Sequence, residues 1–295
     1  MVVAVTLQLF TFTFSLFAAT NSFTVANGGA WETGTSVVYP ISEGYTGGSV
    51  VFAVAGAFEL GANAKFDATA AGFRRYDGRS PVTYAPGFGY SYTIGAGYGG
   101  YGCRDWTYEA ASEYGRPYGF KFAPIHPGSP KGTYDSGGDG SAGRGGGLIR
   151  IHAGAVTIDG MMDASARSDT TSSSSSSGGG IWVTSRGDLS VGAGAKFFAR
   201  GGYKVIGTGL GGGAGGRIAL ACRLSDIERD QLAASGIITG SRPANRRYQD
   251  YTSFTNRYPG ATADLSYGGG GGGDDRCFGT FGFIVPPPGL AIICR

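Results

Sequence analysis

The stretch Gly179-Gly180-Ile181-Trp182-Val183-Thr184 decides the fold, because versions of it return along the chain. Each version begins with a pair of glycines and continues as a short apolar stretch. A break, a second short apolar stretch and a closing glycine follow. Other copies begin at Gly47, Gly146 and Gly215, the last of them partial. Such self-similarity is typical of stacked structural units that bury their apolar faces against one another.

The copies predict short β-strands that pair with the equivalent strands of neighbouring copies. We expect the glycine pairs to supply positive φ angles at corners and to let backbones approach closely. The sequence therefore predicts an all-β fold, a glycine-rich parallel β-solenoid-like body with an N-terminal exchange strand. A β-sandwich with long glycine-rich loops is the alternative. The side chains expected to point inward are Ile149 and Ile151, then Trp182 or Ile181 with Val183, then Ile218 and Leu220.

Changes of composition divide the chain into three parts. Residues 1–21 form an apolar strand or a signal segment. Residues 22–224 form the repeat domain, with an insertion rich in Tyr, Gly and Pro at 73–145. Residues 225–295 form a C-terminal capping or interaction segment. It opens with Ser225-Asp226-Ile227-Glu228, a capping-box pattern that predicts a short helix to about residue 234.

Composition excludes several classes of protein. Gly accounts for 57 of 295 residues without the three-residue period of collagen, and 41% hydrophobic content is too high for a disordered chain. The net charge of +3 leaves no electrostatic footprint for nucleic acid. With 2 His and no catalytic or nucleotide-binding motif in a fitting context, we expect no catalytic residues, no metal, no cofactor and no enzymatic activity.

The N-terminal segment alternates apolar and hydroxyl side chains, the period of a strand with one buried face. It carries no charge and no proline, so its edge must pair with its own domain or with another subunit. A cleaved signal is the alternative, although no basic residue precedes Lys65. The apolar run is too short and too interrupted for a membrane span. The residues predicted to form this assembly strand are Val5, Leu7, Phe10, Phe12, Phe14 and Leu16.

Four cysteines are widely spaced, and none forms the CxxC pair of a zinc site. They favour disulfides formed in an oxidising compartment, with a local bridge between Cys277 and Cys294. Buried thiols are the alternative. The four disulfide candidates are Cys103, Cys222, Cys277 and Cys294.

A run of hydroxyl residues lies between the second and third copies. Its composition predicts either a flexible spacer or an O-glycosylated tract. The candidate O-glycosylation sites are Thr170, Thr171, Ser172, Ser173, Ser174, Ser175, Ser176 and Ser177.

Residues 95–221 resemble a glycine-rich repeat of large secreted and surface proteins. The resemblance implies a structural or adhesin-like protein with a β-solenoid fold, and it brings no catalytic residues. The matching pieces include Gly97-Tyr98-Gly99-Gly100, Gly145 to Ile151, Gly179 to Val183, and Gly211 to Ile218.

These observations predict a structural subunit of an extracellular filament or surface appendage. The N-terminal strand would add to an acceptor groove of the next subunit, giving a homo-polymer. The alternative is a carbohydrate-binding surface adhesin or a polysaccharide-active enzyme. In that case tyrosines such as Tyr98 and Tyr101 would bind glycans, and Asp67 and Asp163 would form a carboxylate pair. We expect those two carboxylates to serve turns instead.

Overall fold

The protein is described here by a computed structural model. The structure describes twelve stretches of the chain. These are residues 15–18, 23–25, 30–32, 49–73, 85–89, 94–103, 115–131, 143–167, 175–202, 211–239, 247–268 and 275–285.

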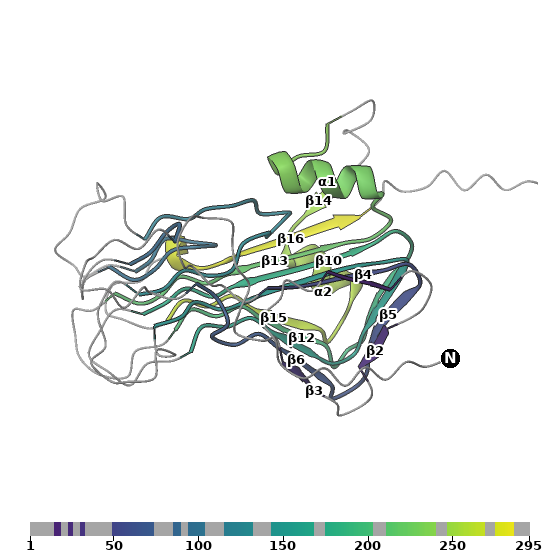
Figure 1. Ribbon diagram of the computed structural model, residues 1–295, viewed down its shortest axis with the longest axis horizontal. Helices are drawn as coiled ribbons and strands as arrows, with labels where there is room; N and C mark the ends of the chain where they lie inside the picture. The colour runs from purple at the N-terminus through teal and green to yellow at the C-terminus, as the bar shows by residue number, and fades with distance from the viewer. Residues whose placement is uncertain are drawn as a thin grey trace, which may run out of the picture.

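Three sheets form the body, and each takes one strand from each successive turn of the chain, so that equivalent strands lie behind one another (Figure 1). Every pairing is parallel except that of β14 with β16. The seven-stranded sheet has the order β1 (Ser15–Ala18), β4 (Ser49–Val54), β7 (Leu148–Ala153), β10 (Gly180–Ser185), β13 (Arg217–Ala221), β16 (Thr280–Val285), β14 (Arg247–Gln249). The four-stranded sheet has the order β11 (Leu189–Val191), β8 (Ala155–Ile158), β5 (Ala57–Leu60), β2 (Phe23–Val25). The five-stranded sheet has the order β15 (Thr262–Asp264), β12 (Lys196–Phe198), β9 (Met161–Asp163), β6 (Lys65–Asp67), β3 (Ala30–Glu32).

Columns of apolar side chains hold the sheets together. The register aligns Phe52, Ile151, Val183, Leu220 and Phe283 in one row across the seven-stranded sheet. All five are buried in the core between the sheets. Because side chains alternate along a strand, the neighbouring row of the same face is buried too. The predicted inward residues are confirmed, with Ile181 and Val183 rather than Trp182 facing the core; the second row is Ile149, Ile181, Ile218 and Phe281.

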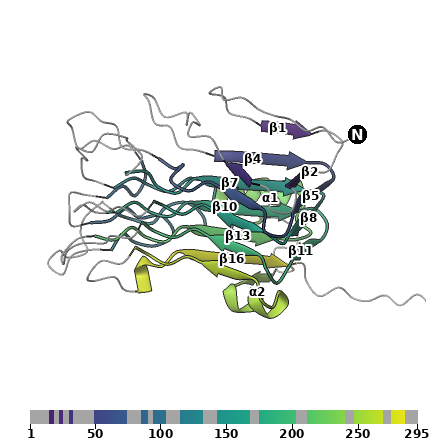
Figure 2. The same ribbon diagram turned by 90° about the horizontal axis from the view of Figure 1, so that it is seen from below.

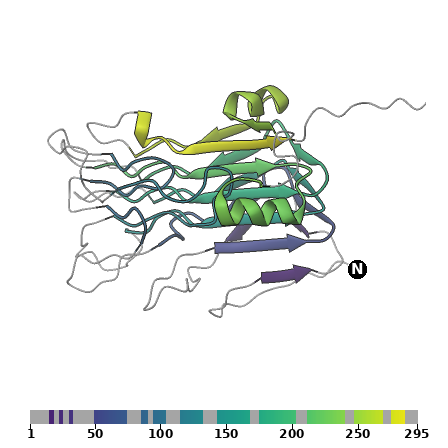
Figure 3. The same cartoon turned by 90° about the horizontal axis from the view of Figure 1, so that it is seen from above.

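The outer face of the seven-stranded sheet carries a second apolar cluster, which includes Trp182, Ala219 and Ile284. Helix α1 (Asp226–Ser235) covers it and contributes Leu232 (Figures 1 and 3). The helix begins at Ser225, and Ser225 and Glu228 each cap the other's backbone amide. The predicted capped helix is therefore confirmed.

Helix α2 (Tyr251–Arg257) closes one end of the core. Its Phe254 is fully buried, with ring centroids 5.0 Å from Phe281, 5.8 Å from Phe283 and 6.1 Å from Phe197. Figure 2 shows α2 beside β16, at the opposite end of the stack from β1.

The prediction of an all-β fold, as a β-solenoid or as a β-sandwich, is wrong. The chain has mixed α/β character, with parallel sheets and the strand–helix–strand segments β13–α1–β14 and β14–α2–β15. After β13 two helices interrupt the strands, α1 capped at Ser225 and α2 capped at Asp250, before β15 and β16 join the sheets. The sequence predicted only the first of these helices, and the fold class was named from the repeat alone.

Glycine-rich segments continue upstream from the strands of the seven-stranded sheet, to the left in Figure 1. Segment 211–216 (GGGAGG) is buried along its whole length. Its carbonyl groups accept hydrogen bonds from three sides in turn, so that every third carbonyl faces the same side. The carbonyls of residues 211 and 214 accept from segment 175–178, and those of residues 212 and 215 accept from segment 99–103. The carbonyls of residues 213 and 216 accept from the amides of Gly268 and Thr280. A three-residue period with hydrogen bonds only to neighbours is that of a polyproline II helix. Several such segments therefore pack side by side through their backbones.

These contacts leave no room for a side chain. A Cβ atom at Gly212 would lie 1.8 Å from the carbonyl oxygen of Gly268, and one at Gly216 would lie 2.0 Å from that of Gly179. Neither glycine has a positive φ angle. The predicted close approach of backbones is confirmed, whereas the predicted positive φ at glycine pairs such as Gly215-Gly216 is wrong. Glycine is required here for space.

Replacing Gly216 by alanine should destabilise the protein by at least about 2 kcal/mol, because a Cβ there meets a hydrogen-bonded backbone that cannot move aside. Gly194→Ala is the matched control, since its Cβ would lie 3.5 Å from the nearest atom, the carbonyl oxygen of Asp159. Urea unfolding measures both variants. Equal midpoints for Gly216→Ala and Gly194→Ala would contradict backbone packing as the reason for glycine.

Candidate functional site

Of the six residues predicted to form the assembly strand, the structure describes only Leu16. Leu16 lies in β1 and pairs in register with Phe52 of β4, in the same chain. The described strand β1 therefore takes part in its own sheet. The remaining residues of that prediction lie outside the described residues: Val5, Leu7, Phe10, Phe12 and Phe14.

The strands β1, β2 and β3 form a complete first turn, and each is the last strand of its sheet. They pair with β4, β5 and β6 on their inner sides. On their outer sides no strand of the described chain pairs with them. A row of unpaired N–H and C=O groups is a template for pairing with another chain.

At the opposite end of the stack, the last strand of each sheet is covered by a different contact. In the seven-stranded sheet, β14 pairs antiparallel with the second half of β16. At the four-stranded sheet, the hydroxyl of Tyr258 donates to the carbonyl of Leu189 in the end strand β11, at 2.7 Å. Burial raises the pKa of the Tyr258 hydroxyl, which keeps it a donor. At the five-stranded sheet, the hydroxyl of Tyr251 accepts from the amide of Ala263 in the end strand β15, at 3.1 Å.

A gap remains in this cover, because β14 pairs only with Phe283 to Val285 of β16. Beside the uncovered first half of β16 lies an open groove of about 500 Å³. Its exposed rings belong to Tyr251, 36% exposed, and Phe278, 46% exposed. The groove is lined by Lys121, Asp250, Tyr251, Ala263, Asp264, Leu265, Ser266, Phe278, Gly279, Thr280 and Phe281. The repeat pattern carried no signal for it, since the groove exists only where β14 stops short.

Each of the two carboxylates of the groove also accepts a hydrogen bond from a nearby backbone amide. Asp250 accepts from the amide of Ser253 at the start of α2, and this hydrogen bond holds the pKa of Asp250 below its ordinary value. Asp264 accepts from the amide of Ser266, two residues on. Together with Lys121 they place charge at the rim of an otherwise apolar groove.

The predicted carboxylates Asp67 and Asp163 lie opposite each other in β6 and β9. Each accepts a hydrogen bond from the backbone amide two residues on, at 2.8 Å and 2.9 Å, as Asp264 does. Burial opposes ionisation of Asp67, but hydrogen bonds from Lys65 and Thr69 outweigh it and hold its pKa below the ordinary value. The prediction that these carboxylates serve turns is therefore confirmed.

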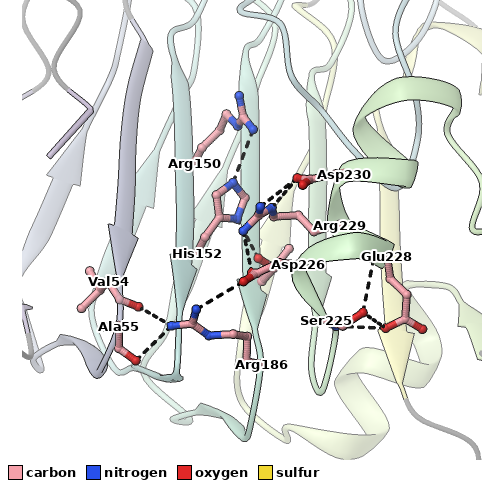
Figure 4. Close-up of polar contacts among 11 residues, drawn as sticks. Val54, Ala55, Arg150, His152, Arg186, Ser225, Asp226, Glu228, Arg229 and Asp230 are labelled. Carbon is pink, nitrogen blue, oxygen red and sulfur yellow. Dashed lines mark hydrogen bonds and ion pairs between the residues drawn. The ribbon is translucent and has the colours of Figure 1, made fainter. Parts of the chain in front are cut away.

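A buried polar cluster lies between the seven-stranded sheet and α1 (Figure 4). Nδ1 of His152 lies 2.6 Å from the hydroxyl of Thr184, and Nε2 lies 3.4 Å from the guanidinium of Arg150. Because a guanidinium only donates, Nε2 is the acceptor and the proton lies on Nδ1. Burial, followed by the charges of Arg150 and Arg229, lowers the pKa of His152 well below its ordinary value. The imidazole is therefore neutral and structural.

Helix α1 is tied to the edge of this cluster by ions (Figure 4). Within the helix, Arg229 pairs with Asp226 and Asp230, each at 2.8 Å. Arg186 contacts Asp226 at 3.5 Å and donates to the carbonyls of Val54 and Ala55, both at 3.0 Å. The contacts of Arg186 link the helix to β4 and its turn, and they help to position α1.

Three of the predicted glycosylation sites are buried. Ser175, Ser176 and Ser177 are at most 2% exposed, which leaves no room for a glycan. The hydroxyl of Ser176 accepts from the amide of Lys131, and that of Ser177 from the amide of Ser129. For these three residues the prediction is wrong, because they belong to the packed backbone segments. Thr170, Thr171, Ser172, Ser173 and Ser174 lie outside the described residues.

Three of the four cysteines are buried: Cys103, Cys222 and Cys277. Cys294 lies outside the described residues, so its bridge to Cys277 stays a prediction. Within the described stretches, no group of three or more His, Cys, Asp or Glu side chains could hold a metal ion. In the same part of the chain, no helix has both the length and the apolar character that crossing a bilayer requires.

No family model matches the chain, and no curated protein and no solved structure is significantly similar to it. The resemblance of residues 95–221 to glycine-rich surface proteins therefore stays a prediction. The function has to be argued from the two ends of the stack.

The buried imidazole predicts a pH dependence of stability. An unfolded histidine, with a pKa near 6.5, takes up a proton that folded His152 does not. The free energy of unfolding should therefore fall as the pH drops below about 6.5, by up to about 1.4 kcal/mol per pH unit for one proton. His126 acts in the same direction, since burial and the charges of Arg150 and Arg217 lower its pKa.

His152→Gln should reduce the slope of the unfolding free energy between pH 7.5 and pH 5, measured by urea titration. His126→Gln is the comparison variant and should reduce it less, because His126 is less deeply buried. If His152→Gln left the slope unchanged, the folded protein would tolerate a charged His152.

Proposed function

We propose that this protein is a structural subunit of an extracellular assembly and that it polymerises head to tail through its N-terminal end. One observation carries the proposal: β1, β2 and β3 are end strands in all three sheets, and their outer edges have no partner strand in the described chain. An edge of three strands without partner strands favours addition of another chain.

The contrast between the two ends supports a directional assembly. At one end no strand of the described chain pairs with the outer sides of β1, β2 and β3, and the other end is covered by α2, β14 and the tyrosine contacts except at the groove. A contact between two different ends is heterologous, and it produces an open polymer unless the rotation happens to close a ring.

The use of the polar groups supports a structural role over an enzymatic one. Asp67, Asp163 and Asp264 hold turns, and His152 is neutral and covered by α1. The glycine-rich segments pack backbone against backbone, which builds rigid material. The extracellular location rests on the cysteines and on the Ser/Thr tract up to Ser174.

Replacing Phe10, Phe12 and Phe14 together by serine should shift the protein from oligomers to monomers of 30.2 kDa. Each buried Phe contributes about 1.5–3 kcal/mol, so assembly should need at least about tenfold more protein. Light scattering after size exclusion and electron microscopy measure this. Thr11→Ser with Thr13→Ser is the matched control and should assemble normally. Unchanged assembly of the triple variant would remove the N-terminal strand from the mechanism.

Glycan binding is the second candidate function. Exposed aromatic rings beside carboxylates suit sugars, which offer apolar faces and hydroxyl donors, and the groove has Tyr251 and Phe278 beside Asp250 and Asp264. Of the tyrosines expected to bind glycans, Tyr98 is buried and Tyr101 is 43% exposed. Glycan-array binding by a monomer that Phe278→Ala abolishes would favour this candidate.

A further inference from the structure

The register of the seven-stranded sheet relates residues before β1 to residues of β16. Ser15 pairs with Val51, and successive pairings carry this row to Gly282 of β16. The row one residue earlier contains Val50 of β4, and it ends at Phe281 of β16. Phe14, which precedes Ser15, would belong to this row. A second molecule that continued this register would therefore bring Phe14 opposite Phe281.

The position of β14 decides which part of a second molecule can fit there. Gln249 of β14 already pairs with Phe283, so the place that Leu16 would take is occupied. The first half of β16, from Thr280 to Gly282, has no strand beyond it in the described chain. In this register only residues up to Ser15 can therefore add to this edge, and the partner chain must turn away before Leu16.

The backbone of β16 presents hydrogen-bonding groups to the groove. The amide of Thr280 donates to Gly216, and the carbonyl of Ile284 accepts from Cys222, both toward β13. Because these directions alternate along a strand, Phe281 directs its N–H and C=O to the other side. The amide of Gly279, which faces the same side, already donates to the carbonyl of Leu265. Phe281 is therefore the residue that offers a donor and an acceptor to an added strand in the groove.

The surface chemistry of the groove matches the N-terminal segment. Its lining includes the apolar residues Ala263, Leu265 and Phe281, and the exposed rings of Tyr251 and Phe278. Segment 10–14 (FTFTF) has no charge, and in an extended conformation its three rings would lie on one face. Apolar rings can bury against this lining while the main chain pairs with Phe281.

A single molecule cannot make this contact with its own segment. β1 and β16 are separated by five strand spacings, which is about 24 Å at about 4.8 Å each. Phe14 directly precedes Ser15 of β1, and consecutive Cα atoms lie about 3.8 Å apart. The occupant of the groove must therefore come from a second copy.

We propose that this groove is the acceptor site for residues 10–14 of a second copy of the chain. The inference rests on the proposed head-to-tail assembly and adds the surface on which the N-terminal segment docks. Phe14 of the incoming copy pairs beside Phe281, and its ring packs among Phe281, Tyr251 and Leu265.

Photo-crosslinking of the full chain tests the contact directly. A photoreactive phenylalanine analogue at position 278, in a mixture of labelled and unlabelled protein, should crosslink to residues 10–14 of another copy. The same analogue at Tyr101 is the matched control, since Tyr101 is equally exposed and does not line the groove. Absence of crosslinks from position 278, or crosslinks to its own chain or to a glycan, would overturn the acceptor site.

Assembly of charged variants tests the same site independently. Phe278→Arg should raise the concentration needed for assembly at least tenfold, whereas Tyr101→Arg should leave it unchanged, with unfolding midpoints confirming that both fold. If the triple serine variant at residues 10, 12 and 14 blocks assembly but Phe278→Arg does not, the acceptor lies elsewhere and the proposed function stands. A wild-type chain that stays monomeric at all concentrations overturns both.

Discussion

Direct contact between backbones is the constraint on which the rest of the structure depends. At Gly212 and Gly216 the space that a Cβ atom would fill is occupied by a neighbouring carbonyl group. The hydrogen bonds of segment 211–216 run to several different neighbours, so each segment is fixed from more than one side. Such packing cannot shift by a residue without losing these bonds, and it therefore sets the register in which the apolar strands downstream enter the sheets.

The register in turn decides what lies inside. Once Gly180 is aligned with Leu148 and Arg217, every core-facing side chain of β10 meets the equivalent residue of its neighbours. The stack gains stability from repetition, but repetition has no natural end. After β13 the helices α1 and α2 interrupt the strands, and β15 and β16 then become the last parallel strands of their sheets. Helix α2 covers this end of the core, whereas α1 covers the outer face of the seven-stranded sheet.

The sequence predicted the parts of the structure that follow from local pattern. The inward rows that contain Ile151 and Val183, and the capped helix at Ser225, depend on spacing alone and were predicted correctly. The fold class was not, because the all-β interpretation rested on the repeat and gave no weight to the helices that lie between β13 and β15. The burial of Ser175 to Ser177 was also missed, since a serine tract has the composition of a loop and only its neighbours bury it. The groove depends on where β14 ends, a long-range fact without a local signal.

The incomplete cover of β16 by β14 links the fold to the proposed assembly. If all three sheets were fully covered at this end of the stack, no strand edge would remain for a second chain to pair with. If none were covered, any strand could add to the open edges. Here β14 leaves the first half of β16 open, beside an apolar lining and two exposed rings. A slot of that length accepts a short, uncharged segment and excludes a whole sheet. Selection of a partner segment by the length of an open edge is a physical basis for directional growth.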